Sequence, residues 1–217
     1  MEIVREMSRG AESVIYECRI FGVKCVLKRR LSKPYRYPIL DLRINRERTL
    51  QESRIMLSAL EAGADVPALL YVEPPSFSIF MEYLEGPTLM ESLMEGKMDA
   101  KFLGNEVGKL VGILHSSGIV HGDLNTKNFL VVGTDVFVID FGLAKRSFEL
   151  EDLGVDVHVF MRSLESVHPA MASEVLHGFS QGYDNVTGSW DKVREKVTEI
   201  RRRGRYVRER KAKYSIG

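Results

Sequence analysis

The spacing of apolar and polar residues changes character along the chain. Within the first thirty residues, two apolar, β-prone runs at 14–16 and 25–27 flank a turn signal at 21–22, which predicts β-structure. The stretch from 39 to 62 is rich in helix formers, follows a proline and stops at a glycine, so it predicts a long helix. Residues 76–84 predict a further strand.

Beyond residue 84 the pattern is mainly helical. A break at Glu85-Gly86-Pro87 follows the last strand. Apolar residues at helical spacing predict an amphipathic helix over residues 101–117. Three more helices are predicted over residues 150–167, 170–182 and 189–203. Strands therefore dominate the first part of the chain and helices the second, and the predicted fold class is α+β.

A predicted hairpin brings three oxygen-bearing side chains together. The apolar runs 129–132 and 136–139 are joined by turn residues, as in a two-stranded β-hairpin. Asn128 precedes the first strand and Asp140 follows the second, so both lie at one end of the hairpin. Asp123 is in a loop that leads to the same end. Two carboxylates and one amide suit Mg²⁺, which prefers oxygen ligands and is usually completed by phosphate oxygens.

Composition narrows the possible functions only slightly. The chain has 217 residues, is 44% hydrophobic and has a formal net charge of +1, so it can form a sizeable core and is not a polyanion binder by bulk charge. The two cysteines, Cys18 and Cys25, do not indicate a disulfide scaffold. The first residues lack the apolar run of a signal peptide, and no apolar run is long enough for a membrane helix. We therefore expect a cytoplasmic protein without a membrane partner.

The residues around the hairpin resemble those of a known family. D-x-x-x-x-N at 123–128, a hairpin, and then Asp140-Phe141-Gly142 resemble the catalytic and metal-binding core of the protein kinase superfamily. The resemblance implies that Asp123 positions and deprotonates an attacking hydroxyl, while Asn128 and Asp140 hold Mg²⁺ on the phosphates of ATP. The alternative, an ordinary surface hairpin with incidental carboxylates, is disfavoured because all three motif elements occur in the right order.

The kinase resemblance extends to the first turn of the chain. A kinase covers the nucleotide phosphates with the loop G-x-G-x-x-G-x-V, of which only the middle glycine is retained here. Small residues matter in this loop because backbone N–H groups must approach phosphate closely. A turn without a ligand is the alternative. The residues that we expect around the nucleotide are Ser8, Gly10, Ala11, Glu12, Ser13 and Ile15.

Lys28 and Glu52 are the next kinase-like pair. Lys28 ends the apolar run 25–27, where kinases have a strand lysine that contacts the α- and β-phosphates. Glu52 shares a predicted helical face with Ile55 and Ala59. A carboxylate on such a face needs a partner, because burying it unpaired costs several kcal/mol. We expect Lys28 and Glu52 to pair and, with Asp123, to form the catalytic set. A solvated lysine and a surface glutamate are the alternatives.

The strand at 76–84 would lead into the hinge between two lobes. The resemblance places Met81 at the back of the adenine pocket. It also implies that Glu82 and Leu84 offer backbone carbonyl and N–H groups to the adenine edge. A core strand followed by a turn is the structural alternative, and both can hold because only backbone groups would be used.

The second half departs from typical protein kinases. His121-Gly122-Asp123 stands where most have H-R-D. That arginine usually pairs with a phosphorylated residue of the activation segment, so no such switch is expected. No A-P-E motif follows Gly142, so the usual platform for a peptide substrate is missing. We expect Asp156, on the helix predicted at 150–167, to accept hydrogen bonds from the backbone of the catalytic loop; an ordinary acidic helix surface is the alternative.

Two further motifs make the resemblance more specific. K-x-Y-R-x-P-x-L-D at 33–41, followed by R-T-x-x-E at 48–52, resembles the PRPK branch of atypical kinases, the small kinase subunit of the KEOPS complex. The resemblance covers nearly the whole chain. It implies a minimal bilobal fold with an N-lobe (residues 1–84), a reduced C-lobe (85–200) and a basic C-terminal tail (201–217).

The same resemblance implies a function. The chain would be an atypical serine/threonine protein kinase or ATPase that uses ATP and Mg²⁺ and supports formation of threonylcarbamoyladenosine in tRNA. Its partners would be the KEOPS transferase subunit and the other small subunits of that complex. A small-molecule kinase of the aminoglycoside or choline type is one alternative, since these enzymes share H-G-D-x-x-x-x-N. A non-catalytic docking subunit is the other.

The C-terminal tail differs from the rest of the chain in charge. Residues 201–217 contain eight cationic side chains and one acidic one, while the whole chain carries +1. Such a segment is most often a solvated end. The segregation of charge also suits contact with tRNA or with the transferase subunit. The cations are Arg201, Arg202, Arg203, Arg205, Arg208, Arg210, Lys211 and Lys213.

Overall fold

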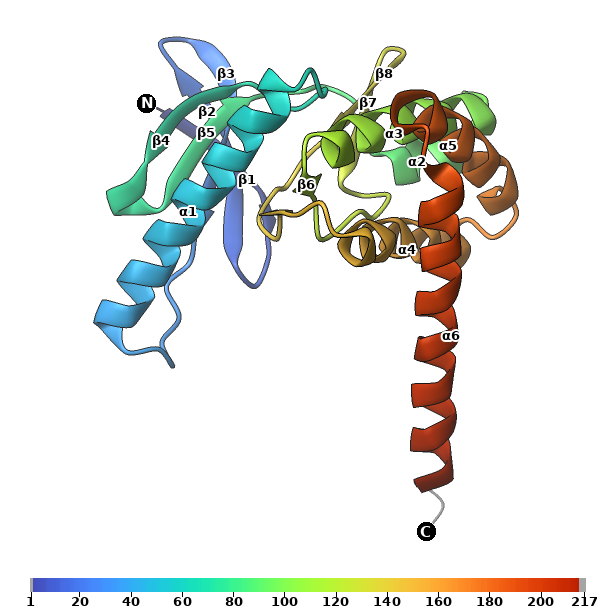
Figure 1. The fold of residues 1–217 in the computed structure, drawn as a ribbon. Helices are drawn as coiled ribbons and strands as arrows, with labels where there is room; N and C mark the ends of the chain where they lie inside the picture. The colour runs from blue at the N-terminus through green and yellow to red at the C-terminus, as the bar shows by residue number, and fades with distance from the viewer. Residues whose placement is uncertain (1, 215–217) are drawn as a thin grey trace.

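The N-lobe is a five-stranded antiparallel sheet with one long helix packed against it (Figure 1). The computed structural model describes the backbone of residues 2–214 and the side chains of residues 2–204. The strand order is β1-β2-β3-β5-β4. The strands are β1 (Glu2–Arg9), β2 (Ser13–Ile20), β3 (Val23–Arg30), β4 (Leu69–Glu73) and β5 (Ser78–Glu82), with a single helical turn, η1 (Pro74–Ser76), between the last two.

Helix α1 (Pro38–Glu61) crosses one face of this sheet (Figure 1). It starts at a proline, which is favourable in the first helical turn because its missing N–H has no partner there in any case. Its buried residues Ile55, Met56 and Ala59 join the main core, which also includes Ile79 of β5. The apolar stripe therefore fixes which face of α1 meets the sheet.

The C-lobe is helical and carries two short two-stranded ribbons. The ribbons are β6 (Ile119–Val120) with β9 (Lys145–Arg146), and β7 (Phe129–Val132) with β8 (Asp135–Val138). The helices are α2 (Leu89–Glu95), α3 (Ala100–Ser116), α4 (Leu150–Val167), α5 (Ala172–Thr187) and α6 (Trp190–Tyr214). Within the part of the chain that the structure describes, no helix has both the length and the apolar content that a membrane span needs.

Helices α3 and α5 approach so closely that glycines contact the backbone of the facing helix. A Cβ atom at Gly108 of α3 would lie 2.2 Å from the carbonyl oxygen of Phe179, and one at Gly178 of α5 would lie 1.9 Å from the carbonyl oxygen of Lys101. No side chain fits at these distances, so this helix pair depends on glycine. The predicted end of α5 at residue 182 is wrong, because the helix continues to Thr187. Gly182 does not end the helix; it is one of the glycines that pack against α3.

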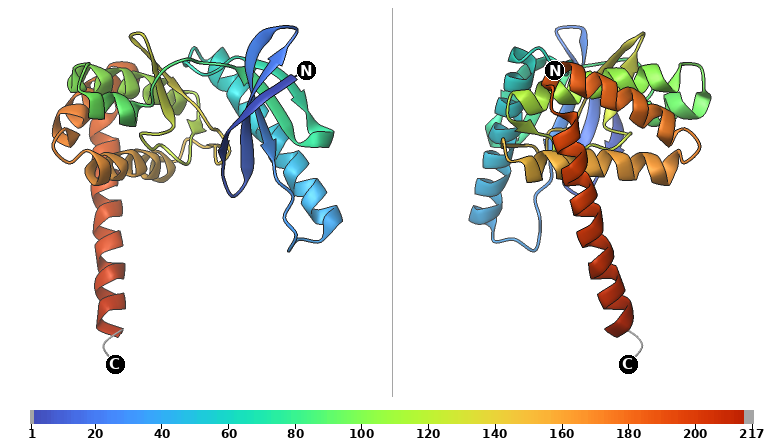
Figure 2. Two further views of the ribbon diagram at one scale, coloured as in Figure 1. Left: turned by 180° about the vertical axis from the view of Figure 1, so that it is seen from behind. Right: turned by 45° about the vertical axis from the view of Figure 1, so that its right-hand side comes forward.

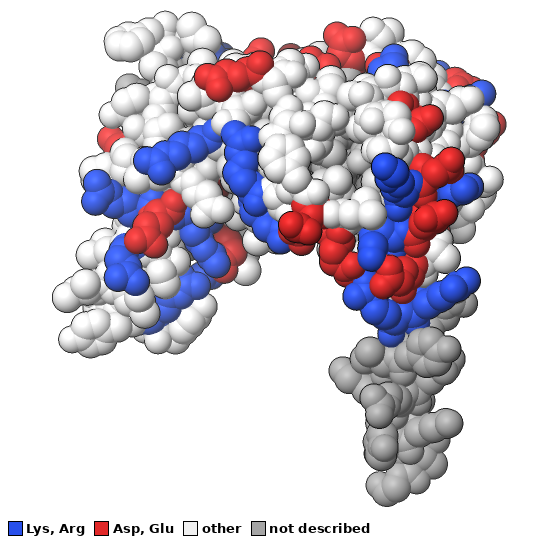
Figure 3. Space-filling view, viewed as in Figure 1, with Lys and Arg blue, Asp and Glu red and all other residues white. Residues whose placement is uncertain are grey.

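Helix α6 is continuous and projects away from the C-lobe (Figures 1 and 2). Its first half is anchored by the buried Val193 and Val197 and by an ion pair of 2.7 Å between Arg201 and Glu165 of α4. Figure 3 shows acidic and basic side chains interleaved where α6 meets α4. The predicted helix end at residue 203 is wrong, because α6 runs to Tyr214, and the tail boundary at residue 200 falls inside this helix.

The described part of the predicted tail is mostly exposed, but two of its cations contact the C-lobe. Arg201 and Arg203 pair with acidic residues of α4. The side chains of residues 205–217, which include five of the eight cations, lie outside the described side chains.

Most of the other predicted elements are confirmed within one or two residues. The β2–β3 hairpin turns at Phe21-Gly22, where both residues have positive φ. The α1, α3 and α4 helices and the β7–β8 hairpin occur where the apolar spacing places them. Strand β4 and helix α2 were not predicted; both are short, and β4 pairs only with β5 at one edge of the sheet.

Candidate active site

The open end of the β7–β8 hairpin, opposite its turn, brings the predicted metal ligands near each other. The backbone N–H of Ile139 donates to the carbonyl oxygen of Asn128 at 2.9 Å, which joins the two ends of the hairpin. Asn128 Nδ2 donates to the carbonyl oxygen and to Oδ2 of Asp123, at 2.9 and 3.0 Å. The amide nitrogen of Asn128 is therefore engaged, and its oxygen faces away from these bonds.

Asp140 connects the hairpin to the N-lobe. Its Oδ1 accepts hydrogen bonds from Lys28 Nζ at 2.6 Å and from the backbone N–H of Gly142 at 3.1 Å. The backbone of Asp140 has φ +65°, a left-handed conformation that costs free energy in a residue other than glycine. Observed strain of this kind is concentrated at functional sites, and here it occurs at a residue that the sequence had assigned to the metal.

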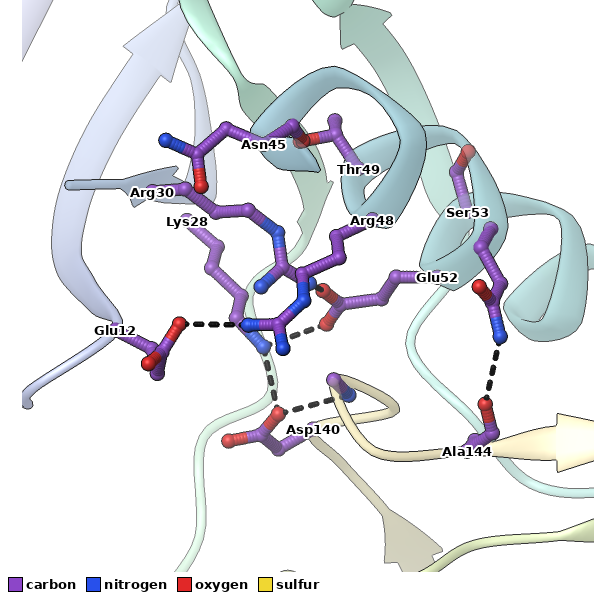
Figure 4. A network of polar contacts seen from close by, with 12 residues as sticks. Glu12, Lys28, Arg30, Asn45, Arg48, Thr49, Glu52, Ser53, Asp140 and Ala144 are labelled. Carbon is purple, nitrogen blue, oxygen red and sulfur yellow. Dashed lines mark hydrogen bonds and ion pairs between the residues drawn. The ribbon is translucent and has the colours of Figure 1, made fainter. Parts of the chain in front are cut away.

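Lys28 and Glu52 pair as predicted. Lys28 Nζ lies 2.5 Å from Glu52 Oε1 and both side chains are buried (Figure 4). Burial alone lowers the pKa of Lys28, but the neighbouring carboxylates of Glu52 and Asp140 together outweigh it, and the pKa of Lys28 is raised. Burial raises the pKa of Asp140, but the Lys28 ammonium outweighs it and lowers that pKa. Both groups are therefore charged at neutral pH.

A second cation on Glu52 was missed by the sequence argument. Arg30 Nη2 forms an ion pair with Glu52 Oε2, and the arginine side chain is only 4% exposed. Lys28 and Arg30 are two positions apart on β3, so they lie on the same face of the sheet. That spacing was visible in the sequence and could have indicated the contact.

Asp156 holds the catalytic loop by its backbone, as predicted. Its carboxylate accepts hydrogen bonds from the backbone N–H groups of His121 at 2.7 Å and of Gly122 at 2.8 Å. His115 Nε2 lies 3.3 Å from the same carboxylate, and His115 Nδ1 lies 3.0 Å from the hydroxyl of Tyr183. Three buried polar side chains, one from each of three helices, therefore fix the segment that ends at Asp123.

Gly122 has a structural reason for replacing the usual arginine. Its φ is +83°, and a Cβ atom there would lie 2.5 Å from the carbonyl oxygen of Leu143. The segment after Gly142 thus lies directly against the catalytic loop. A side chain at position 122 would need both an unfavourable backbone conformation and a displaced neighbour.

The predicted phosphate-covering loop connects β1 to β2. Ser8 and Ile15 pair across these two strands, and the N–H of Gly10 donates to the carbonyl oxygen of Ser13 at 2.9 Å. The side chain of Glu12 lies 2.8 Å from Arg48 of α1. Lys33 Nζ donates to the carbonyl oxygen of Ala11. The loop is therefore held against α1 and the segment that follows β3.

The predicted hinge residues lie at the end of β5. Met81 is buried and pairs with Val26 of β3. The backbone N–H of Glu82 donates to the carbonyl oxygen of Ala68 at 2.9 Å, and Leu84 follows the strand in the connection to the C-lobe. The strand is part of the core, as the alternative of a core strand followed by a turn predicted. It also places these backbone groups at the junction of the lobes.

The donor set fits Mg²⁺ better than a metal held by protein alone. Among the described side chains, no group of three or more His, Cys, Asp and Glu residues is arranged to hold a metal ion. Asp140 and the amide oxygen of Asn128 would supply two oxygen ligands, with Asp123 beside them. Mg²⁺ commonly uses one or two carboxylates and completes its shell with substrate phosphates and water.

Comparison with known proteins places these features in one family. Residues 1–190 match the family model of the protein kinase domain. The KEOPS complex subunit Bud32 of Pyrococcus abyssi is 39% identical, covering 92% of this chain and 95% of the relative. The EKC/KEOPS complex subunit bud32 of Dictyostelium discoideum is 34% identical, covering 92% of this chain and 82% of the relative.

Longer relatives and a solved structure also match. A probable bifunctional tRNA threonylcarbamoyladenosine biosynthesis protein of Methanothermobacter thermautotrophicus is 36% identical over 93% of this chain, which spans 36% of that protein. The Rio2 kinase of Chaetomium thermophilum, solved as an ADP/Mg²⁺-phosphoaspartate complex, superposes with a TM-score of 0.63 at 15% identity. The superposition covers 95% of this chain and 72% of Rio2, and it confirms the kinase-like fold. With its kinase-domain match and these close relatives, the chain belongs to the Bud32 branch of the protein kinase family.

Proposed function

We propose that this chain binds Mg-ATP between its lobes and transfers or hydrolyses the γ-phosphate. The observation that carries the proposal is the position of the Lys28 ammonium, 2.5 Å from Glu52 and 2.6 Å from Asp140. A buried cation beside a half-exposed carboxylate can contact phosphate while the carboxylate faces a metal ion.

The remaining residues have distinct tasks in this proposal. Asp123 lies against Asn128 and orients the attacking hydroxyl or water, accepting its proton. Asn128 and Asp140 would hold Mg²⁺, which, when bound, neutralises charge on the phosphate oxygens. Asp156 keeps the backbone on which Asp123 is carried at a fixed position. Residues Ser8–Ser13 cover the phosphates, and the segment Met81–Leu84 borders the adenine.

Two substitutions test the catalytic assignment. Asp123→Ala should lower the ATP turnover rate by roughly 10²–10⁴, and Asp140→Ala should lower it at least as much. Asp135→Ala is the matched control, because Asp135 lies at the opposite, exposed end of the same hairpin. Turnover is measured as phosphate release. An unchanged far-UV circular dichroism spectrum shows that each variant is folded. Near-normal turnover in either active-site variant would contradict the proposal.

We further propose that the chain acts within a KEOPS complex and supports threonylcarbamoyladenosine formation in tRNA. Its relatives carry these names, and one of them matches over nearly its full length. No A-P-E segment provides a peptide platform, so the phosphate of ATP need not go to a protein. Assaying ATP consumption with and without the other KEOPS subunits and tRNA tests this. Unchanged turnover under all conditions would contradict a role in the complex.

The end of α6 is the proposed contact to the transferase subunit or tRNA. Arg201 and Arg203 already pair with Glu165 and Glu151 of α4, so truncation after Gly204 removes five cations without disturbing these pairs. Each lost phosphate contact should flatten the slope of log affinity against log salt by roughly 0.7–0.9. Arg19→Ala, at an exposed position of β2, is the control. Equal tRNA affinity, salt slope and complex activity in truncated and full-length protein would refute the contact.

A further inference from the structure

Two sequence motifs are only partly explained by the catalytic set. K-x-Y-R-x-P-x-L-D at 33–41 runs from the segment after β3 into the first turn of α1, and R-T-x-x-E at 48–52 lies within α1. Of these residues, only Glu52 belongs to the catalytic set. The first residue of each motif, Lys33 in one and Arg48 in the other, contacts the phosphate-covering loop instead.

Three contacts hold this loop where it connects β1 to β2. Lys33 Nζ donates a hydrogen bond to the carbonyl oxygen of Ala11. Arg48 Nη1 donates to Glu12 Oε2 at 2.8 Å, and Figure 4 shows the two side chains directed at each other. The backbone N–H of Leu31 donates to the carbonyl oxygen of Glu12 at 3.0 Å. Two neighbouring loop residues are therefore bound both to α1 and to the segment after β3.

The segment that carries Lys33 is itself fixed to α1. The buried carboxylate of Asp41, in the first turn of α1, accepts hydrogen bonds from the backbone N–H of Lys33 and from Arg36 Nη1, both at 3.3 Å. Asn45 Nδ2 donates to the other oxygen of Asp41 at 3.1 Å. The Lys33 side chain is only 14% exposed, so its ammonium has little room to move elsewhere. Loop, segment and helix thus form a closed ring of contacts.

We propose that Lys33, Arg48 and Glu12 are positioning residues that hold the phosphate-covering loop in place before the nucleotide binds. This inference rests on the proposed function. Ordering a mobile loop during binding costs affinity, so a loop that is already held binds the nucleotide phosphates more tightly. The first residues of the two motifs then serve ATP binding through the loop.

The charge of Glu12 separates this role from simple attraction. A carboxylate in a loop that covers phosphates repels them, so attraction between charges alone predicts that removing it strengthens ATP binding. Removing the arginine that pairs with it would weaken binding in that case. If the pair acts by holding the loop, loss of either partner weakens binding. The two explanations therefore differ in sign at one residue.

ATP binding by two neutral variants tests the proposal. Arg48→Gln and Glu12→Gln should each weaken the Kd for Mg-ATP, measured by calorimetry, by only about threefold, because the pair is half-exposed. The double variant should bind no more weakly than either single variant, since all three lack the same contact. Tighter binding or an unchanged Kd in Glu12→Gln, or additive losses in the double variant, would overturn the proposal.

Two controls separate the position of the loop from a general change in the N-lobe. Adenosine has no phosphates, so its Kd should be the same in the wild type and in both variants. Arg43→Gln removes a cation from an exposed ion pair on the same helix and should leave both Kd values unchanged. Equal losses of adenosine and Mg-ATP binding in Arg48→Gln would contradict an effect through the loop.

Hydrogen exchange in the ligand-free protein gives an answer that does not depend on ATP binding. The amides of Gly10 and Leu31 donate the backbone hydrogen bonds that close the loop. Lys33→Met should speed exchange at both amides by about tenfold, because it removes a charge-assisted hydrogen bond to the loop. Unchanged exchange there would overturn the proposal. If the wild type fails to bind Mg-ATP, the proposed function is wrong, and the exchange rates still decide whether Lys33 holds the loop.

Discussion

The two sides of the candidate site are built by different means. On the N-lobe side, Arg30, Glu52 and Lys28 are long side chains that meet Asp140 through charge. On the C-lobe side, the catalytic loop is held through its own backbone, by a single buried carboxylate at Asp156. Ion pairs between flexible side chains can change partners, whereas bonds to backbone amides cannot move without moving the chain.

The same contrast continues into the supporting structure. The N-lobe helix α1 contacts its sheet through apolar side chains, while α3 and α5 of the C-lobe touch through glycines and carbonyl groups. Interiors packed at backbone distance have little freedom to adjust. The C-lobe side of the site is therefore packed at backbone distance, and the N-lobe side is held by side chains that can change partners.

The largest expected loss of stability is at the carboxylate that holds the loop. Asp156→Ala leaves the buried N–H of His121 and the partly buried N–H of Gly122 without acceptors, and we expect the free energy of unfolding to fall by about 4 kcal/mol. Asp152→Ala, on the same helix, removes an ion pair with Lys145 that is open to water and should cost less than about 1 kcal/mol. Urea denaturation measures both. Similar losses for the two variants would erase the distinction between backbone anchoring and surface pairing.

The next largest effect is expected at the α3–α5 contact. Gly108→Ala places a methyl group 2.2 Å from a carbonyl oxygen, so the helices must separate, at a cost of about 3 kcal/mol. Gly204→Ala on α6 makes the same change where no atom lies within 4 Å, and it should be neutral or stabilising. Thermal unfolding of the two variants compares them. A tolerated alanine at position 108 would mean that the C-lobe is less rigid than described.

The ion-pair cluster of Lys28, Arg30 and Glu52 should lose less stability on substitution than the two C-lobe contacts. Glu52→Gln keeps the shape and one acceptor oxygen, and Lys28 keeps Asp140, so we expect a stability loss of about 2 kcal/mol. ATP turnover should fall far more steeply, because Lys28 loses its positioning partner. The exposed Glu47→Gln on the same helix should change neither property. A stability loss larger than that of Asp156→Ala would reverse the comparison.

The smallest expected effect is the change in stability at acidic pH. The pKa of Asp140 in the folded protein lies below its ordinary value of 3.8, so its pairing stabilises the fold above about pH 4 and is lost as pH falls further. The pKa of Lys28 is raised, so its contribution persists until strongly alkaline pH. At pH 7 the free energy of unfolding of the wild type should exceed that of Asp140→Asn by under about 1 kcal/mol, since the aspartate is half-exposed. The gap should close in acid; a gap that widens there would contradict the assigned direction.

The sequence predicted local elements and the site motifs better than long-range packing. The hairpin that joins Asn128 to Asp140 follows from two apolar runs and the turn between them. The pairing of Lys28 with Glu52 and the bonds to Asp156 were expected from the kinase resemblance. The ion pair of Arg30 and the glycine contacts of α3 with α5 depend on which distant segments meet. The glycines at 104, 108 and 112 and at 178 and 182 were visible, but the facing helix that requires them was not.

Gly122 also limits the mutations by which this chain could gain an arginine at that position. Most protein kinases carry arginine at this position, but here any side chain would meet the carbonyl oxygen of Leu143 at 2.5 Å. A single codon change to arginine would disturb the catalytic loop before it could create a phosphate sensor. The segment after Gly142 would have to be rerouted first, which has no benefit until the arginine is present. The glycine at position 122 is therefore hard to replace in one step, because the backbone at Leu143 has to move before a side chain fits.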